Sequence, residues 1–278
     1  MRASRLAITV GTHFVLVVGV LFALLPILWI GAAALQPPAR LYQYPPRWIP
    51  ETLYLENFSD VLDTKIPVQM LNSTLVSGAT AAVVVVAGSL AAYAFARFRF
   101  RFRDALFLSI LATQMIPALT KIVPLYLMMQ GVGGVNTRWS LVLVYVGVSL
   151  PFGVWILTGF FEGLPKEIEE AAYIDGASRV GAFFRIALPL ALPGLAAVAI
   201  LTFVAAWNDF VIALVLTSNP DLKTYQLGLY DFLTNLTFQQ DQIGLLNAAA
   251  VLGVVPTVIA YLLVQRYFMA GLTAGAVK

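Results

Sequence analysis

Long apolar runs alternate with short polar segments along most of this chain. Six of the runs are each long enough to cross the hydrocarbon core of a membrane, which is about 30 Å thick and needs about 20 helical residues. They cover residues 8–35, 69–96, 105–129, 139–161, 190–217 and 244–266. The pattern predicts an all-α, polytopic membrane protein with six transmembrane helices, in which residues 1–278 form a single transmembrane domain.

Composition supports this membrane assignment. Hydrophobic residues make up 60% of the chain and charged residues 11%, with a mean hydropathy of +0.86, whereas soluble domains carry about 25% charged residues. The excess apolar surface must therefore face lipid or other membrane helices. The absence of cysteine excludes disulfides, thiolate metal sites and cysteine nucleophiles. The single histidine, His13, gives little support to a histidine metal site or a Ser–His triad.

The N-terminal run has two interpretations, a cleaved signal peptide or a retained first helix. Basic residues precede it, and Ala32–Ala34 offers small side chains for cleavage. The apolar run is about twice as long as the apolar region of a signal peptide. We therefore expect an uncleaved first helix.

The basic residues predict the orientation of the helices. Most of them lie at one set of span ends, which the positive-inside rule places in the cytoplasm together with both termini. Arg and Phe alternate from Arg97 to Arg103, and we expect these arginines to face anionic lipid headgroups. The net charge of +3 is accordingly interpreted as orientation charge and not as affinity for nucleic acid. The residues assigned to the cytoplasmic side are Arg2, Arg5, Arg97, Arg99, Arg101, Arg103, Lys166, Arg179, Arg185, Arg266 and Lys278.

The most informative polar segment is the predicted cytoplasmic loop at about 162–189. Pro165 suits the start of a helix, and the glutamates at 167–170 favour the positive end of its dipole. Gly176 can adopt the left-handed conformation that ends a helix. A second short helix is expected over 177–188, broken by the following proline. A short helix of this kind suits docking on a partner, although a plain surface helix is the alternative.

This loop resembles the signature of inner-membrane permeases in binding-protein-dependent ATP-binding-cassette (ABC) importers. That signature is Glu-Ala-Ala, three residues, Gly, nine residues, Ile, one residue and Leu-Pro, often with Asp before the Gly. The matching residues are Glu170, Ala171, Ala172, Asp175, Gly176, Ile186, Leu188 and Pro189. The resemblance implies the ABC importer permease fold, with six spans and both termini cytoplasmic, in the bacterial inner membrane.

The resemblance also implies a role for the loop and a set of partners. In that family the loop forms coupling helices that sit in a cleft of the ATP-binding subunit, so ATPase coupling would involve Glu170, Ala171, Ala172, Asp175 and Gly176. ATP and Mg²⁺ would be bound by that partner ATPase, and no cofactor is expected in this chain. The other expected partners are a second six-span permease subunit, an extracytoplasmic solute-binding protein and membrane lipid.

Two further segments indicate the solute class. Residues 206–210, Ala-Trp-Asn-Asp-Phe, resemble the Trp-Asn motif of carbohydrate permeases, and residues 271–278 resemble the tail of the maltose-system permease. The resemblance implies import of a sugar, oligosaccharide or polyol. A glycerol-phosphate-type solute is the alternative, and the sequence leaves open whether the permease pair is homo- or heteromeric.

Polar residues within spans are candidates for the translocation path. Asn208 and Asp209 lie about 19–20 residues after Pro189, at or beyond mid-membrane at 1.5 Å per residue. They line the translocation cavity, or they form a hydrogen-bonded helix contact or a helix end near the outer interface. Lys121, in a span expected to be kinked at Pro117 and Pro124, contacts solute, pairs with Asp209, or reaches the surface. Gln114 is a weaker candidate. Residues 72–74, Asn-Ser-Thr, are expected to cap the second span.

No catalytic site is visible in the sequence. The P-loop signature Gly-x-x-x-x-Gly-Lys-Ser/Thr is absent, and we interpret the loop glutamates as a solvated acidic turn, not a metal cluster. The chain is therefore predicted not to be an enzyme. An ion-coupled secondary transporter would need membrane carboxylates or an inverted repeat; Asp209 is the one strong candidate. A membrane-embedded enzyme would need paired nucleophile and base residues, which the spans lack.

Overall fold

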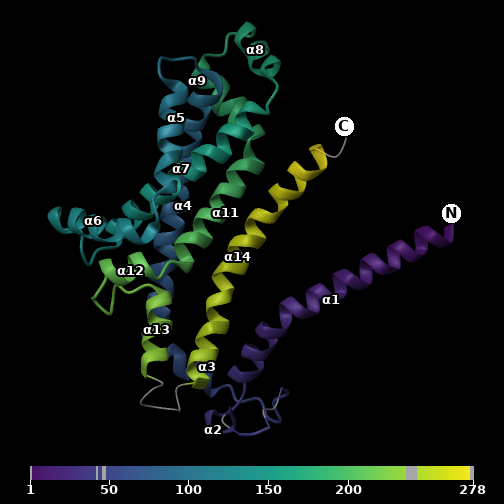
Figure 1. Cartoon of the computed structure of the whole chain (residues 1–278), viewed down its shortest axis with the longest axis vertical. Coiled ribbons are helices and arrows are strands. Elements are labelled where there is room, and N and C mark those ends of the chain that lie inside the picture. The colour runs from purple at the N-terminus through teal and green to yellow at the C-terminus, as the bar shows by residue number, and fades with distance from the viewer. Residues whose placement is uncertain (1, 42, 46–47, 236–242, 276–278) are drawn as a thin grey trace. The chain divides into compact units, whose positions relative to one another are not determined.

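The computed structural model describes residues 2–41, 43–45, 48–235 and 243–275, and these form helices and connecting turns without a strand (Figure 1). The chain divides into two compact units, residues 1–67 with 228–255 and residues 68–227 with 256–278. The prediction of a single domain stays a prediction. The two units are described in turn.

The first unit contains α1 (Arg2–Ala34), α2 (Pro38–Leu41) and α3 (Glu56–Leu62), with parts of α13 (Tyr225–Asn235) and α14 (Ile243–Gly275). Asn57 joins two of these elements. Its Nδ2 donates to the carbonyls of Ala34 at 2.8 Å and Gln36 at 2.9 Å, which satisfies acceptors that the end of α1 leaves free. At Gly244 a Cβ atom would lie 2.4 Å from Asn57 Oδ1, so α14 packs closely against α3 only because this residue has no side chain.

The second unit is built around α4 (Ile66–Arg97), α7 (Arg138–Glu162) and α11 (Leu192–Asn208), which run side by side in Figure 1. Glycines allow close approach of these helices, as is usual between membrane helices. A Cβ at Gly153 would lie 2.9 Å from Val84, and one at Gly194 would lie 2.5 Å from the ring of Phe160. The buried core consists of Val84, Ala92, Tyr93, Phe95, Val154, Leu157, Phe161, Phe183, Ala187, Ala191, Leu195 and Val198.

The predicted spans correspond to these helices with two differences. In the described residues, α1, α4, α7 and α14 are each long and apolar enough to cross a membrane, and two further bent pairs raise the number to six if each pair is one span. An all-helical membrane fold is therefore confirmed. Six spans and cytoplasmic termini stay predictions.

The third predicted span is broken rather than only kinked. It consists of α5 (Arg103–Ala112), a 3₁₀ turn (Thr113–Met115) and α6 (Ala118–Gly131), bent by 101°. The break lies at Pro117, because a residue before proline is pushed out of helical geometry and Ile116 has an extended backbone with ψ of 122°. Pro124 lies inside α6. The expected kink is confirmed at the first proline.

The fifth predicted span is also interrupted. α11 ends at Asn208, the backbone of Asp209 is extended, and α12 (Val211–Leu216) follows after Phe210. The candidate path residues therefore lie next to a helix break, where backbone groups need partners from outside the helix.

The expectation that residues 72–74 cap the second span is wrong, because α4 begins six residues earlier, at Ile66. Asn72 instead lies within the helix, where its Nδ2 donates to the carbonyls of Asp221 at 2.9 Å and Lys223 at 3.0 Å, and its Oδ1 accepts from Arg138 at 2.9 Å. These contacts fasten the segment before α13 to α4 and α7.

Candidate functional site

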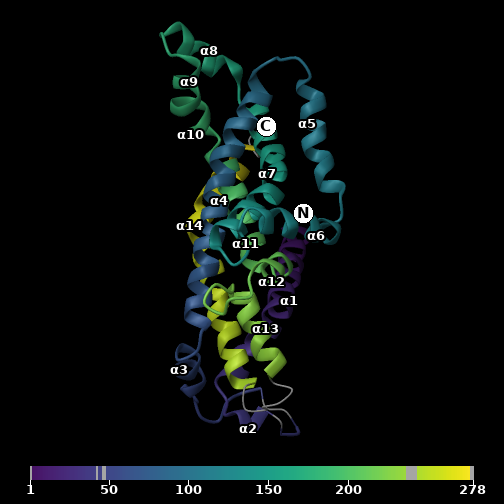
Figure 2. The ribbon, with the colours of Figure 1, turned by 90° about the vertical axis from the view of Figure 1, so that its left-hand side faces the viewer.

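The predicted coupling loop forms α8 (Lys166–Ile174) and α9 (Arg179–Ala182), which Figure 2 shows at the upper left, near the upper end of α4. Pro165 precedes α8 as its N-cap, and Gly176 follows it with φ of +86°. The amide of Gly176 donates to Tyr173 at 3.1 Å and that of Ala177 to Ala172 at 2.8 Å. This pair of bonds is the Schellman motif. The predicted start and stop of the helix are therefore confirmed.

The second helix of the loop begins at Arg179, two residues later than predicted, because Ser178 caps it by accepting from the amide of Gly181. It continues through a π-helical turn (Phe183–Ala187) into α10 (Leu188–Leu190). Proline lacks an amide hydrogen and its ring clashes with the carbonyl four residues before it. The turn before Pro189 accordingly widens, and the Leu188 amide donates to Phe183. The chain then bends by 72° into α11.

The outer face of α8 and α9 is exposed in this chain and is called the coupling surface below. Glu170, Ala171, Asp175 and Gly176 are exposed, and Ala172 is half-buried. Apolar side chains accompany them: Ile174 is 87% exposed and Val180 67%. Isolated exposed apolar residues are common, but several on one short polar loop indicate a contact surface.

Glu169 differs from its neighbours and corrects the prediction of a solvated acidic turn. It is buried, and its Oε1 accepts from Arg97 Nε at 2.7 Å, while its Oε2 accepts from the Tyr93 hydroxyl at 2.6 Å. Arg97 Nη2 also donates to the carbonyl of Leu164 at 3.0 Å. Glu167 and Glu170 are exposed as expected. Among the described residues, no cluster of acidic and histidine side chains is arranged to hold a metal ion.

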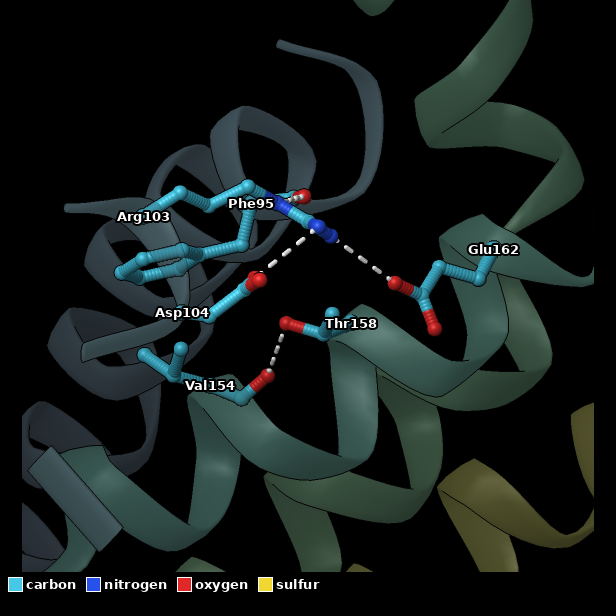
Figure 3. A network of polar contacts seen from close by, with 6 residues as sticks. All are labelled: Phe95, Arg103, Asp104, Val154, Thr158 and Glu162. Carbon is cyan, nitrogen blue, oxygen red and sulfur yellow. Dashed lines mark hydrogen bonds and ion pairs between the residues drawn. The ribbon is translucent and has the colours of Figure 1, made fainter. Parts of the chain in front are cut away.

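Arg103 is the second arginine of the 97–103 segment that binds other protein groups (Figure 3). Its Nε donates to the carbonyl of Phe95 at 2.5 Å, and its guanidinium pairs with Asp104 at 3.2 Å and Glu162 at 3.1 Å. These groups border a cavity of about 280 Å³ that also includes Trp155. The headgroup prediction is therefore wrong for Arg97, which is buried, whereas for Arg103, which is partly exposed, it stays a prediction. Asp104 is the next residue in the chain, but Glu162, Leu164 and Glu169 come from distant segments, which sequence spacing does not show.

Lys121 and Asp209 line one cavity of about 130 Å³ together with residues of α6, α7 and α12. Within the described chain the two side chains form no ion pair, because Lys121 Nζ donates to the Thr113 carbonyl at 3.0 Å. Asp209 Oδ1 accepts from the Tyr145 hydroxyl at 2.8 Å and from the amides of Ile212 and Ala213. Asp209 thus combines two of the roles considered from the sequence, a helix contact and a cavity wall, and it directly follows the end of α11.

Gln114 and Asn208 occupy different places. Gln114 lines a larger, mainly apolar cavity of about 640 Å³ that also includes Lys121, and its Nε2 donates to the Val148 carbonyl at 2.9 Å. Asn208 lies outside the linings of these two cavities; its Nδ2 donates to Val204 at 3.0 Å and its Oδ1 accepts from Gln226 at 3.4 Å. The structure therefore groups Gln114 and Asp209 around Lys121 and leaves Asn208 apart.

Sequence reasoning missed the roles of three residues of these sites: Tyr93, Arg97 and Tyr145. The tyrosines lie in apolar runs, and no spacing rule pairs either of them with a carboxylate in a distant segment. Trp207, part of the Trp-Asn motif, is 2% exposed and stacks between Phe203 and Tyr225, so it has a packing role. In the predicted maltose-like tail, residues 276–278 lie outside the described residues.

Comparison with known proteins agrees with the loop motif and the fold. Residues 84–273 match the family described as binding-protein-dependent transport system inner membrane component. The sulfoquinovosyl glycerol transport system permease SmoH of Agrobacterium fabrum is 35% identical over 256 residues, 92% of this chain and 89% of that protein. The trehalose transport system permease SugB of Mycobacterium tuberculosis is 34% identical over 264 residues, 95% of this chain and 94% of that protein.

The fold is shared with solved transporters. A bacterial ABC transporter involved in the import of the acidic polysaccharide alginate superposes with a TM-score of 0.77 at 24% identity, covering 96% of this chain and 98% of that chain. A bacterial alginate ABC transporter in complex with an alginate pentasaccharide-bound periplasmic protein gives 0.63 at 15% identity, covering 93% and 95%. The matched family, the relatives and the helical fold show that this chain belongs to the inner membrane components of binding-protein-dependent transport systems.

Proposed function

We propose that this chain is the permease subunit of a sugar-importing ABC transporter and couples to a separate ATPase through α8. Two of the relatives that match most of its length are permeases named for sulfoquinovosyl glycerol and trehalose. Membership of this permease family disfavours the ion-coupled secondary transporter considered from the sequence, and the chain itself carries no P-loop for ATP.

The observation that carries the coupling proposal is the coupling surface itself. α8 is a short helix fixed at both ends, by Pro165 and by the Schellman bonds at Gly176, and its outer face combines small, acidic and apolar side chains. An amphipathic helix of this kind can lay its apolar side chains into a groove on a partner. We assign the groove to the ATPase, with Glu170, Ala171, Ala172, Asp175 and Gly176 in the contact.

The proposed translocation path follows the helix breaks of the second unit. Broken helices near a cavity are typical of transporter binding sites, because their free backbone groups and charged side chains can face the solute. Lys121 offers a cationic donor and Asp209 an acceptor on the walls of one cavity, with Gln114 beside Lys121 in the other. Such a mixed set suits the hydroxyl groups of a sugar. ATP-driven movement of α8 would expose this path to alternate sides of the membrane.

The expected complex contains two ATPase subunits, a second permease subunit and an external solute-binding protein. Affinity purification of the tagged chain from its native membrane tests this composition. Co-purification of an ABC ATPase with a sugar-binding protein supports the proposal. Purification of the chain alone, with gradient-driven uptake in proteoliposomes that lack any ATPase, would overturn it.

A further inference from the structure

A buried ion pair joins the coupling loop to a transmembrane helix. Glu169 lies in the first turn of α8, and Arg97 is the last residue of α4, 72 positions earlier in the chain. Their side chains are only 5% and 8% exposed. Tyr93, one turn before Arg97, donates to the second carboxylate oxygen, so both oxygens of Glu169 are held by the same helix.

Arg97 attaches the start of α8 to α4 at two points. Arg97 binds Glu169 within the helix and the carbonyl of Leu164 just before it. Two attachments on one guanidinium fix both the position and the direction of α8 relative to α4. The Tyr93 ring in turn contacts Phe161 of α7 and Phe183 of the π-helical turn, with ring centroids 5.5 and 4.8 Å apart. The ion pair and Tyr93 therefore lie where the two ends of the coupling loop meet the transmembrane helices.

Stability alone does not account for this arrangement. Burying two charges costs desolvation energy that a well-packed apolar contact avoids. Arg97 Nη1 is also buried without an acceptor among the described residues, which is a further cost. An ion pair does, however, define one geometry much more strictly than apolar contacts do. This strictness is useful if the orientation of α8 has to be transmitted.

The geometry separates two functions on one short helix. Adjacent residues on an α-helix point about 100° apart, so Glu169 faces α4 while Glu170 and Ala171 lie on the coupling surface. α4 is 32 residues long, or about 48 Å at 1.5 Å per residue. At its other end it holds the segment before α13 through Asn72 and Ser73. A displacement of α8 that is passed to α4 would therefore reach the opposite end of this unit.

We propose that Glu169 and Arg97 are positioning residues of energy coupling, with Tyr93 as their support. The ion pair makes α8 and α4 move as one body, so that a shift imposed on the coupling surface is delivered to α4 directly and not only through the covalent connections to α7 and α11. This inference rests on the proposed function, because it needs an ATPase that moves α8.

The test is Glu169→Gln in the complete complex, reconstituted in proteoliposomes with its ATPase and solute-binding protein. We expect the complex to assemble and hydrolyse ATP while the solute transported per ATP falls about tenfold, within the usual range of coupling between sites. Glu167→Gln, two residues away on the exposed side of the same helix, is the matched control and should keep the wild-type ratio. Equal ratios for Glu169→Gln and the wild type would overturn the inference.

A second variant distinguishes loss of a rigid link between α8 and α4 from simple loss of folding as the cause of a transport defect. Because the chain contains no cysteine, Arg97→Cys with Glu169→Cys can be joined selectively by a short bismaleimide. The uncrosslinked pair should hydrolyse ATP with little transport, and the crosslinked pair should recover transport per ATP. Failure of the crosslink to restore the ratio would overturn the inference. A wild-type complex without ATP-driven transport would overturn the proposed function and this inference together.

Discussion

The hydroxyl of Tyr145 in α7 donates to Asp209 Oδ1 at 2.8 Å, and the same oxygen accepts from the amides of Ile212 and Ala213. One carboxylate therefore caps α12 and ties the break after α11 to α7. This arrangement explains why a charged residue can lie between two apolar helices: its desolvation is offset by hydrogen bonds from groups that would otherwise be unpaired.

Asp209 caps α12 and binds Tyr145, and variants that remove one or both of these interactions are predicted to lose different amounts of stability. Asp209→Ala removes the cap as well as the tyrosine partner and should cost about 2–3 kcal/mol, whereas Tyr145→Phe removes one bond and should cost about 1 kcal/mol. Asp209→Asn keeps an acceptor and should fall between them. Thermal unfolding of the purified variants in detergent gives this order. Equal losses for Tyr145→Phe and Asp209→Ala would contradict the capping role.

Lys121 is predicted to contribute to the solute path. Its ammonium group has a backbone carbonyl as acceptor and faces two cavities. Lys121→Met keeps the aliphatic length but removes the donor, and the loss of a charged hydrogen bond of about 1.5–3 kcal/mol should raise the solute concentration for half-maximal uptake about tenfold or more. Thr120→Val, the exposed neighbour, is the control. Unchanged uptake kinetics for Lys121→Met would remove this residue from the path.

Gly176 is predicted to be required for its backbone conformation and not for space. Its φ is +86°, and a Cβ there would meet nothing within 4 Å. Left-handed geometry costs about 1–2 kcal/mol for ordinary residues but less for asparagine. Gly176→Asn should therefore retain more ATPase in co-purification than Gly176→Ala, and Gly176→Val should retain least. If all three variants retain the ATPase equally, the end of α8 does not determine docking.

Gly194 is predicted to be required for space. A Cβ at this position would lie 2.5 Å from the Phe160 ring, and overpacking of this kind usually costs about 1–3 kcal/mol. Gly194→Ala should lower the unfolding temperature, and Phe160→Leu in the same chain should restore part of it. Gly147→Ala in α7, where a Cβ meets nothing within 4 Å, is the control. Because alanine favours a helix more than glycine does, the control should keep or gain stability, and similar losses at both positions would show that contact with Phe160 does not decide the effect.

Much of the membrane architecture follows from local sequence. A run of about 20 apolar residues needs no distant partner to become a helix in lipid, since each backbone group bonds within the helix. The start of α8 at Pro165 and its end at Gly176 were predictable for the same reason, because both depend on the backbone geometry of one residue. The position of the break at Pro117 was also predictable from local sequence, but the angle between α5 and α6 was not.

The sites depended on tertiary structure. Glu167, Glu169 and Glu170 look alike as a sequence, and helical periodicity says only that they point in different directions. Glu169 is buried because Arg97 and Tyr93 approach it from α4, and Asp209 is satisfied because Tyr145 approaches it from α7. A hydrogen bond needs two groups within about 3 Å of each other, and for residues 64 to 76 positions apart only the packing of the helices brings them that close.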